Sequence, residues 1–142
     1  MTASKLTAGL AALALSTFSV AGLAANDSVL TSPPDAPYQA VSALVPLPDF
    51  IPGLGQLFVD PATLPAGPFL GYDHDGKLVS TTYMVPLALM DSSFNLDNLK
   101  VPGAPVDHVD MNYNAGHPGV EEPHVHIVLW HVSADEEGRV AK

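Results

Sequence analysis

The sequence of 142 residues contains no cysteine, so no disulfide can support its fold and no thiolate can bind a metal or attack a substrate. Basic residues are also scarce: five lysines and arginines stand against fifteen aspartates and glutamates, and the formal net charge is −10. Nucleic acid binding depends on clustered positive charge. The composition therefore argues against a nucleic acid partner.

Motifs for nucleophilic and nucleotide chemistry are missing as well. The chain has no Gly-x-Ser-x-Gly elbow, no phosphate-cradling glycine loop and no dinucleotide fingerprint. The sequence thus gives no support to a serine hydrolase or a nucleotide-dependent enzyme.

Residues 1–25 have the three parts of a secretory signal peptide. Lys5 precedes the apolar stretch 6–20, and small residues follow up to Ala25. An uncleaved membrane span needs roughly 20 strongly apolar residues, whereas serine and threonine interrupt this alanine-rich stretch. We predict cleavage after Ala24 or Ala25 and a periplasmic or extracellular location. The acidic mature chain should be repelled by anionic lipid, so we expect no membrane partner after cleavage.

The rest of the chain is expected to form one domain with two appendages. Residues 26–53 are rich in proline, which disfavours helices and central strands, so we predict an extended arm that is loose up to Tyr38. Residues 54–133 form the predicted β-rich domain. Residues 134–142 are a charged tail that we expect to be frayed.

Strand patterns dominate the predicted domain. Short β-prone runs cover residues 56–60, 69–72 and 78–85, and the Asp75-Gly76 pair between the last two predicts a hairpin turn. Polar and apolar residues alternate over 106–113 and 124–132, as in strands with one buried face. We expect a mainly β fold, either a small antiparallel sandwich or a partly open barrel.

Histidines are concentrated in these last two predicted strands. Five of the six fall between positions 108 and 131. His124 and His126 share one strand face, and His108 and Asp110 share one face of the other predicted strand. If these strands are antiparallel neighbours, all four side chains project from one face, and His117 lies in the connecting loop.

This pattern predicts a metal site formed by His108, Asp110, His117, His124 and His126. Imidazole and carboxylate ligands suit zinc, copper or iron, and the pattern does not distinguish among them. An open coordination position could bind water or a small molecule. Whether the protein is an enzyme stays open, because hydrolytic and oxygen chemistry are both compatible with such ligands.

Other polar residues have simpler interpretations. By strand parity His131 lies on the face opposite His124 and is expected to be structural, while His74 should be exposed in the hairpin turn. Glu121 and Glu122 are interpreted as the solvated tip of a loop. Trp130 is expected in the core or at an interface.

Several segments resemble an uncharacterised family of exported bacterial proteins, sometimes described as a domain of unknown function. The resemblance rests on three C-terminal segments, 105–110, 116–118 and 123–126, and on upstream pieces such as 67–73 and 83–86. It implies a β-rich domain with a histidine motif that assembles into rings. Many members have Pro-His-x-Asp-x-His, whereas this chain has His126 at the acidic position and Val128 at the last histidine.

Two functional hypotheses follow. The first is an exported β-domain that binds one transition metal through the histidine cluster. The second is a non-catalytic, ring-forming assembly or binding protein, in which the histidines are structural and the partner is another copy of the chain.

Overall fold

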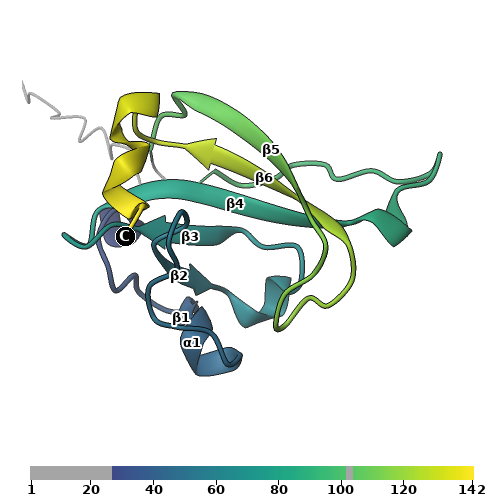
Figure 1. Ribbon diagram of the computed structural model, residues 1–142, viewed down its shortest axis with the longest axis horizontal. Helices are drawn as coiled ribbons and strands as arrows, with labels where there is room; N and C mark the ends of the chain where they lie inside the picture. The colour runs from purple at the N-terminus through teal and green to yellow at the C-terminus, as the bar shows by residue number, and fades with distance from the viewer. Residues whose placement is uncertain (1–26, 102–103) are drawn as a thin grey trace, which may run out of the picture.

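The computed structural model describes residues 27–101 and 104–142 and shows a single antiparallel sheet (Figure 1). Its six strands are arranged in the order β1-β2-β3-β4-β6-β5. The predicted mainly β fold is confirmed. The strands are β1 (Gln39–Ala40), β2 (Gln56–Val59), β3 (Phe69–Tyr72), β4 (Leu78–Pro86), β5 (His108–Asn114) and β6 (His124–Trp130).

Strand β4 is the central element, and eight consecutive residues of it, Leu78–Val85, are buried. It pairs with β3 through the predicted hairpin, in which the Asp73 carboxylate accepts hydrogen bonds from the backbone N–H groups of Asp75 and Lys77. Gly76 has a φ of +71°, a conformation that the turn requires and that glycine adopts without strain. Gly76 therefore plays the role predicted for it, whereas the aspartate side chain that shapes the turn is that of Asp73 and not that of Asp75.

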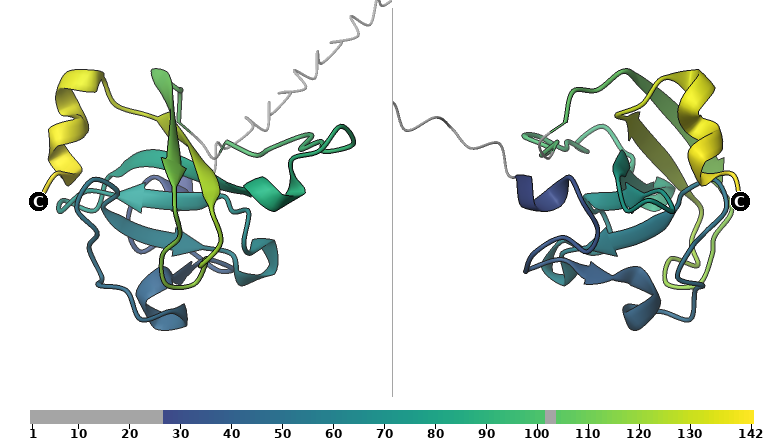
Figure 2. Two further views of the ribbon diagram at one scale, coloured as in Figure 1. Left: turned by 45° about the vertical axis from the view of Figure 1, so that its right-hand side comes forward. Right: turned by 90° about the vertical axis from the view of Figure 1, so that its left-hand side faces the viewer.

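The sheet curls, so that β5 and β6 cross the line of the earlier strands (Figure 2). Register places Val59, Phe69, Met84 and His126 on one face of the sheet. Here Val59, Phe69 and Met84 pack with Val41 in one of three hydrophobic clusters. The histidines of β6 consequently face the interior and not the solvent.

The proline-rich segment differs from the loose arm that was expected. It forms a 3-10 helix, η1 (Asp27–Val29), strand β1 and a short helix, α1 (Val41–Leu44). Val29 is only 4% exposed, and its carbonyl accepts a 2.8 Å hydrogen bond from the Tyr72 hydroxyl. Proline removes only its own N–H donor, so the carbonyls and side chains of this segment remain free to bind the sheet.

The C-terminal tail also differs from expectation. Residues Ala134–Val140 form a 3-10 helix, η4, that begins with a capping box between Ser133 and Glu136. Val140 is 1% exposed, and Arg139 forms an ion pair with the buried Asp73. The charges of this tail stabilise a docked helix instead of keeping it in solvent. Two further 3-10 turns are η2 (Pro61–Thr63) and η3 (Leu87–Leu89).

Residues 1–26, which contain the predicted signal peptide, lie outside the described residues. Within the described ranges, the chain forms no helix with the length and hydrophobicity needed to cross a bilayer.

Candidate metal site

The two histidine-bearing strands are antiparallel neighbours, as predicted. The pairs Asn112↔His126 and Asn114↔His124 fix their register, and the even-numbered residues of both strands lie on one face. His108 is opposite Trp130, at the far end of the pair. His108 lies four residues along the strand from Asn112, the partner of His126. In extended chain this is a distance of about 14 Å. The sequence predicted the common face correctly but not this separation.

The five predicted ligands are therefore divided between two places. His117, His124 and His126 form one group, in which a ligand nitrogen from each ring lies within 4.8 Å of the others. His108 and Asp110 form a second group with Glu137, whose contribution was not expected from sequence. We call the first group the three-histidine cluster.

Backbone carbonyls fix the orientation of two rings in this cluster. The Nδ1 atom of His124 donates to the carbonyl oxygen of Glu122 at 2.7 Å, and Nδ1 of His117 donates to the carbonyl oxygen of Pro118 at 3.0 Å. A neutral imidazole that donates through Nδ1 keeps its lone pair on Nε2. Such a second contact commonly orients a metal-binding histidine.

His126 is the buried member whose ionisation is most strongly altered. Burial, together with the smaller effects of the neighbouring His124 and His117, lowers the pKa of His126 to about 4. Its Nε2 atom lies 2.9 Å from Nε2 of His124, which accepts this hydrogen bond. His126 is therefore neutral near pH 7 and can coordinate an ion once its proton is on Nδ1.

The loop between β5 and β6 brings His117 over the strand pair. Gly116 has a φ of +127°, and an added Cβ atom would lie 2.4 Å from the carbonyl oxygen of Glu121. His117 and Val120 then form reciprocal backbone hydrogen bonds of 2.9 and 3.0 Å. The position of the His117 ring thus depends on a glycine and a tight turn, which gave no distinct signal in the sequence.

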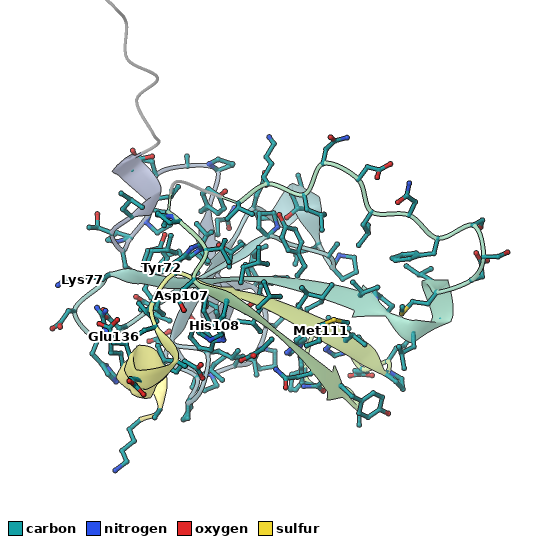
Figure 3. The ribbon with its side chains drawn as sticks, turned by 90° about the horizontal axis from the view of Figure 1, so that it is seen from above. Tyr72, Lys77, Asp107, His108, Met111 and Glu136 are labelled. Carbon is teal, nitrogen blue, oxygen red and sulfur yellow. The ribbon has the colours of Figure 1, made fainter. Side chains whose placement is uncertain are left out.

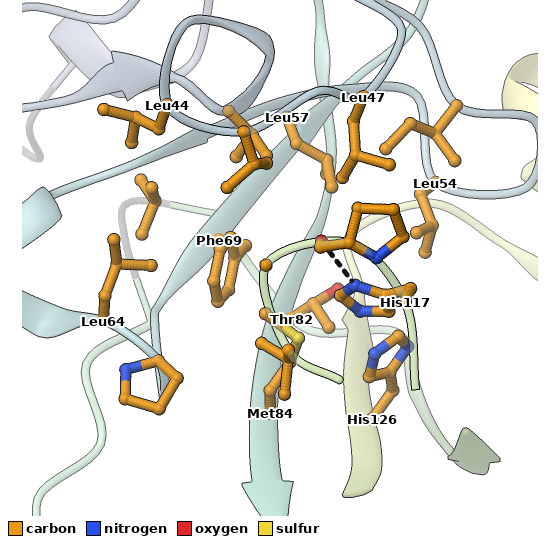
Figure 4. Close-up of a pocket in the computed structure, with 18 of the residues that line it drawn as sticks. Leu44, Leu47, Leu54, Leu57, Leu64, Phe69, Thr82, Met84, His117 and His126 are labelled. Atoms are coloured by element: carbon orange, nitrogen blue, oxygen red, sulfur yellow. Dashed lines mark hydrogen bonds between the residues drawn. The ribbon is translucent and has the colours of Figure 1, made fainter. Parts of the chain in front are cut away.

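His117 and His126 also line one end of a cavity of about 280 Å³ (Figure 4). Leu44 and Leu64 lie at the other end, and Thr82 and Met84 of β4 lie between. None of the described residues around this cavity carries a charge. Sequence analysis did not identify the cavity, because much of its wall comes from the proline-rich segment that was expected to be an arm.

The second group is a hydrogen-bonded clamp. His108 bonds Asp107 through Nδ1 at 2.9 Å and Glu137 through Nε2 at 2.8 Å, and these two contacts raise the pKa of His108. Asp110 accepts a 3.0 Å hydrogen bond from the Trp130 indole. Figure 3 shows His108 and Asp107 beside the C-terminal helix. With both ring nitrogens engaged by carboxylates, His108 is suited to ion pairing rather than to metal binding.

The remaining polar residues lie where the sequence placed them. His131 is hydrogen-bonded to the Thr81 hydroxyl and the Pro105 carbonyl, and His74 is exposed. Glu121 and Glu122 are exposed in the loop. Trp130 is buried in a hydrophobic cluster with Val79, Val128, Val132 and Val140.

Comparisons with known proteins identify relatives but no activity. Residues 73–113 match the model of the TTHB210-like family, described as hypothetical protein TTHB210. The crystal structure of hypothetical protein TTHB210 from Thermus thermophilus is 48% identical, with a TM-score of 0.57, over 67% of this chain and 87% of that one. The chain belongs to the TTHB210-like family. No curated protein matches it.

Membership of the TTHB210-like family confirms that the chain resembles an uncharacterised family. The relatives are described only as hypothetical proteins, which assigns them no ligand, location or assembly. Export and ring formation therefore stay predictions for this chain, and its function must be argued from the site.

Proposed function

We propose that the protein binds one transition metal ion through His117, His124 and His126. The observation that carries this proposal is the convergence of three imidazole nitrogens within 4.8 Å. Two of the rings are oriented by backbone carbonyls so that Nε2 faces the cluster. The third is kept neutral by burial, and a neutral ring is the form that coordinates a metal.

The chemistry of the three side chains restricts the choice of metal ion. Three imidazoles without thiolate suit zinc, copper or iron. Three protein ligands leave a further position for water or a substrate, as in catalytic sites. Because His117 and His126 line the cavity, a molecule bound there would lie beside an ion held by the cluster. The site could activate water or bind oxygen, and the arrangement does not select between these reactions.

A purely structural cluster is the competing interpretation. It would satisfy the imidazoles by hydrogen bonds, as the His124–His126 contact does. His117 argues against it, because among the described residues no protein group hydrogen-bonds to its Nε2 atom. A structural role also does not explain three rings directed at one point beside a cavity.

Metal analysis of protein purified without an affinity tag tests the proposal. After incubation with zinc, copper(II) or iron(II) and removal of free ion, the wild type should retain about one ion per chain. The His124→Ala/His126→Ala double variant and the His117→Ala single variant should lose it. His108→Ala is the matched control, because His108 belongs to the other group, and it should retain the ion.

Equal metal content in the wild type and in a folded His117→Ala variant would contradict the proposal. His117 is half-buried in a loop, whereas His124 is fully buried, so the loop variant remains informative even if the double variant unfolds. Circular dichroism establishes which variants are folded.

We also propose that the chain associates with copies of itself. The outer face of edge strand β5 exposes Val109, Met111 and Tyr113, which are 52, 68 and 66% accessible. Exposed apolar patches of this kind mark interaction surfaces. Light scattering should show an oligomer that Met111→Lys weakens, whereas the exposed control Lys77→Met should not weaken it. A wild-type monomer at all concentrations would contradict self-association.

Export is the third part of the proposal and rests on the sequence of residues 1–25. N-terminal sequencing of protein recovered outside the cytoplasm should begin close to Asn26. A mature chain that begins within the first twenty residues would contradict cleavage by a signal peptidase.

A further inference from the structure

We infer that the cavity beside the three-histidine cluster binds a medium-chain carboxylate, with the carboxylate on the metal ion and the chain among the apolar side chains. This inference rests on the proposed metal site and names the class of molecule that the site would take.

The size and lining of the cavity indicate what kind of hydrocarbon chain the ligand has. Its wall is almost wholly aliphatic and aromatic, with Leu44, Leu57, Leu64 and Phe69 among the residues away from the histidines. A cavity of roughly 150 Å³ accommodates the six carbons of benzene. The cavity of about 280 Å³ therefore suits a ligand of about a dozen non-hydrogen atoms, the size of decanoate.

The charge balance of the proposed metal site indicates what head group the ligand has. Three neutral imidazoles leave the double positive charge of the ion uncompensated, and the other described residues around the cavity are uncharged. An uncompensated charge in a low-dielectric site is costly. A carboxylate would neutralise part of this charge and fill the open coordination position. An alcohol of the same length would bind as a neutral ligand and leave this charge uncompensated.

A second, independent observation lies on β4. The Thr82 hydroxyl is buried and has no hydrogen-bond partner within the described residues, and Thr82 lines the cavity. Buried hydroxyls normally have a partner. Thr82 is on the same face as His126, because Met84 is paired with His126 and Thr82 is two residues from Met84. Its hydroxyl is placed to donate to the second carboxylate oxygen.

Ser80 provides a matched comparison. Its hydroxyl is also buried without a partner, and it is also on β4, but Ser80 does not line the cavity. Removing either unpaired hydroxyl should make the ligand-free protein at least as stable as the wild type, because no hydrogen bond is lost. Only removal of the Thr82 hydroxyl should weaken ligand binding.

Isothermal titration calorimetry on zinc-loaded and zinc-free protein tests the inference with decanoate, 1-decanol and acetate. Zinc-loaded wild type should bind decanoate at least about tenfold more tightly than 1-decanol, and acetate more weakly still. Removal of zinc should abolish the preference for decanoate over 1-decanol. Thr82→Val should weaken decanoate binding about tenfold, without loss of zinc or stability, and Ser80→Ala should leave binding unchanged.

A variant that fills the apolar end of the cavity tests the binding of the ligand's chain separately from the binding of its carboxylate. Leu44 is 37% exposed, so Leu44→Trp can be accommodated at the rim while its ring enters the cavity. It should retain zinc and bind decanoate more weakly. Protein that retains about one zinc but shows no decanoate binding, or equal binding of decanoate and 1-decanol, would overturn the inference and leave the metal site standing. Protein that binds no metal would overturn both.

Discussion

The Nε2 atoms of His124 and His126 lie 2.9 Å apart on the inward face of β6. Two nitrogens bound to one tetrahedral zinc ion at 2.0–2.1 Å are about 3.3 Å apart. Replacing the hydrogen bond by two coordinate bonds therefore needs a shift of only a few tenths of an ångström. The strand itself provides this geometry, because residues i and i+2 project from the same face.

Metal should stabilise the folded chain measurably. An ion at a hundred times its dissociation constant adds about 2.7 kcal/mol to the free energy of unfolding, which for a domain of this size corresponds to a rise in Tm of roughly 10 °C. Thermal unfolding followed by circular dichroism should show this rise with zinc and its reversal by a chelator. An equal rise in the His124→Ala/His126→Ala variant would assign the effect to another site.

The turn at Gly116 should control metal affinity without supplying a ligand. Gly116→Ala would place a Cβ atom 2.4 Å from the Glu121 carbonyl oxygen, which forces the His117 loop to move. Zinc affinity, measured by competition with a chromophoric chelator, should fall at least about tenfold, since a misplaced ligand loses much of its bond.

Gly53→Ala is the control for backbone strain in that experiment. Gly53 has a similar positive φ of +85°, but an added Cβ atom there meets no atom within 4 Å. It should cost some stability and leave zinc affinity unchanged. Equal affinity losses in the two variants would show that strain, and not the position of His117, is responsible.

The sequence could predict the face of the histidines but not their register. Alternation has a period of two, so any even shift between β5 and β6 keeps His108 and His126 on one face. The actual register is set by the loop from Asn114 to His124, whose closure depends on turns at Gly116 and Gly119. The pattern could not reveal how many residues this loop uses.

Tertiary packing explains what else the sequence missed. Val41 and Leu44 looked like parts of a proline-rich arm, yet they form the wall of the cavity opposite the histidines. Proline content shows which backbone hydrogen bonds a segment cannot form. It does not indicate which surface of the protein the segment covers. The strands β3 and β4 were predicted well, because turn chemistry and β-prone runs are local signals.

The His108 clamp should make stability depend on pH. Hydrogen bonds to Asp107 and then to Glu137 raise the pKa of His108 in the folded state. The stabilisation that protonated His108 gives the folded state is complete below its unfolded pKa of about 6.5. It is lost as the pH rises through the higher folded pKa. The difference in unfolding free energy between wild type and His108→Gln should therefore be larger near pH 5.5 than near pH 8.5.

Urea unfolding of both proteins at several pH values checks this prediction. Subtracting one unfolding free energy from the other removes the contribution of histidines whose pH dependence has the opposite sign. Burial lowers the pKa values of His126 and His131, so both disfavour the fold as the pH falls below about 6.5. Those residues are shared by the two proteins. A difference that grows toward alkaline pH would contradict the assignment of His108 as a protonated clamp.

The ion pair between Arg139 and Asp73 should hold the C-terminal helix on the sheet. The Asp73 side chain is 3% exposed, and its Oδ2 atom accepts a 2.9 Å hydrogen bond from Nε of Arg139. Burial would raise the pKa of Asp73, but hydrogen bonds from the Lys77 backbone and from Arg139 outweigh it and lower the pKa. Arg139→Met leaves this carboxylate buried without its cation.

The expected loss in the free energy of unfolding is about 2 kcal/mol near pH 7, below the range for fully buried pairs because Arg139 is 31% exposed. Urea unfolding measures it, with Lys77→Met as a control for the loss of an exposed positive charge. Because the folded pKa of Asp73 is depressed, the loss should shrink as the pH falls below about 4 and the carboxylate is protonated. A loss that is independent of pH would indicate that the Arg139 side chain acts through packing alone.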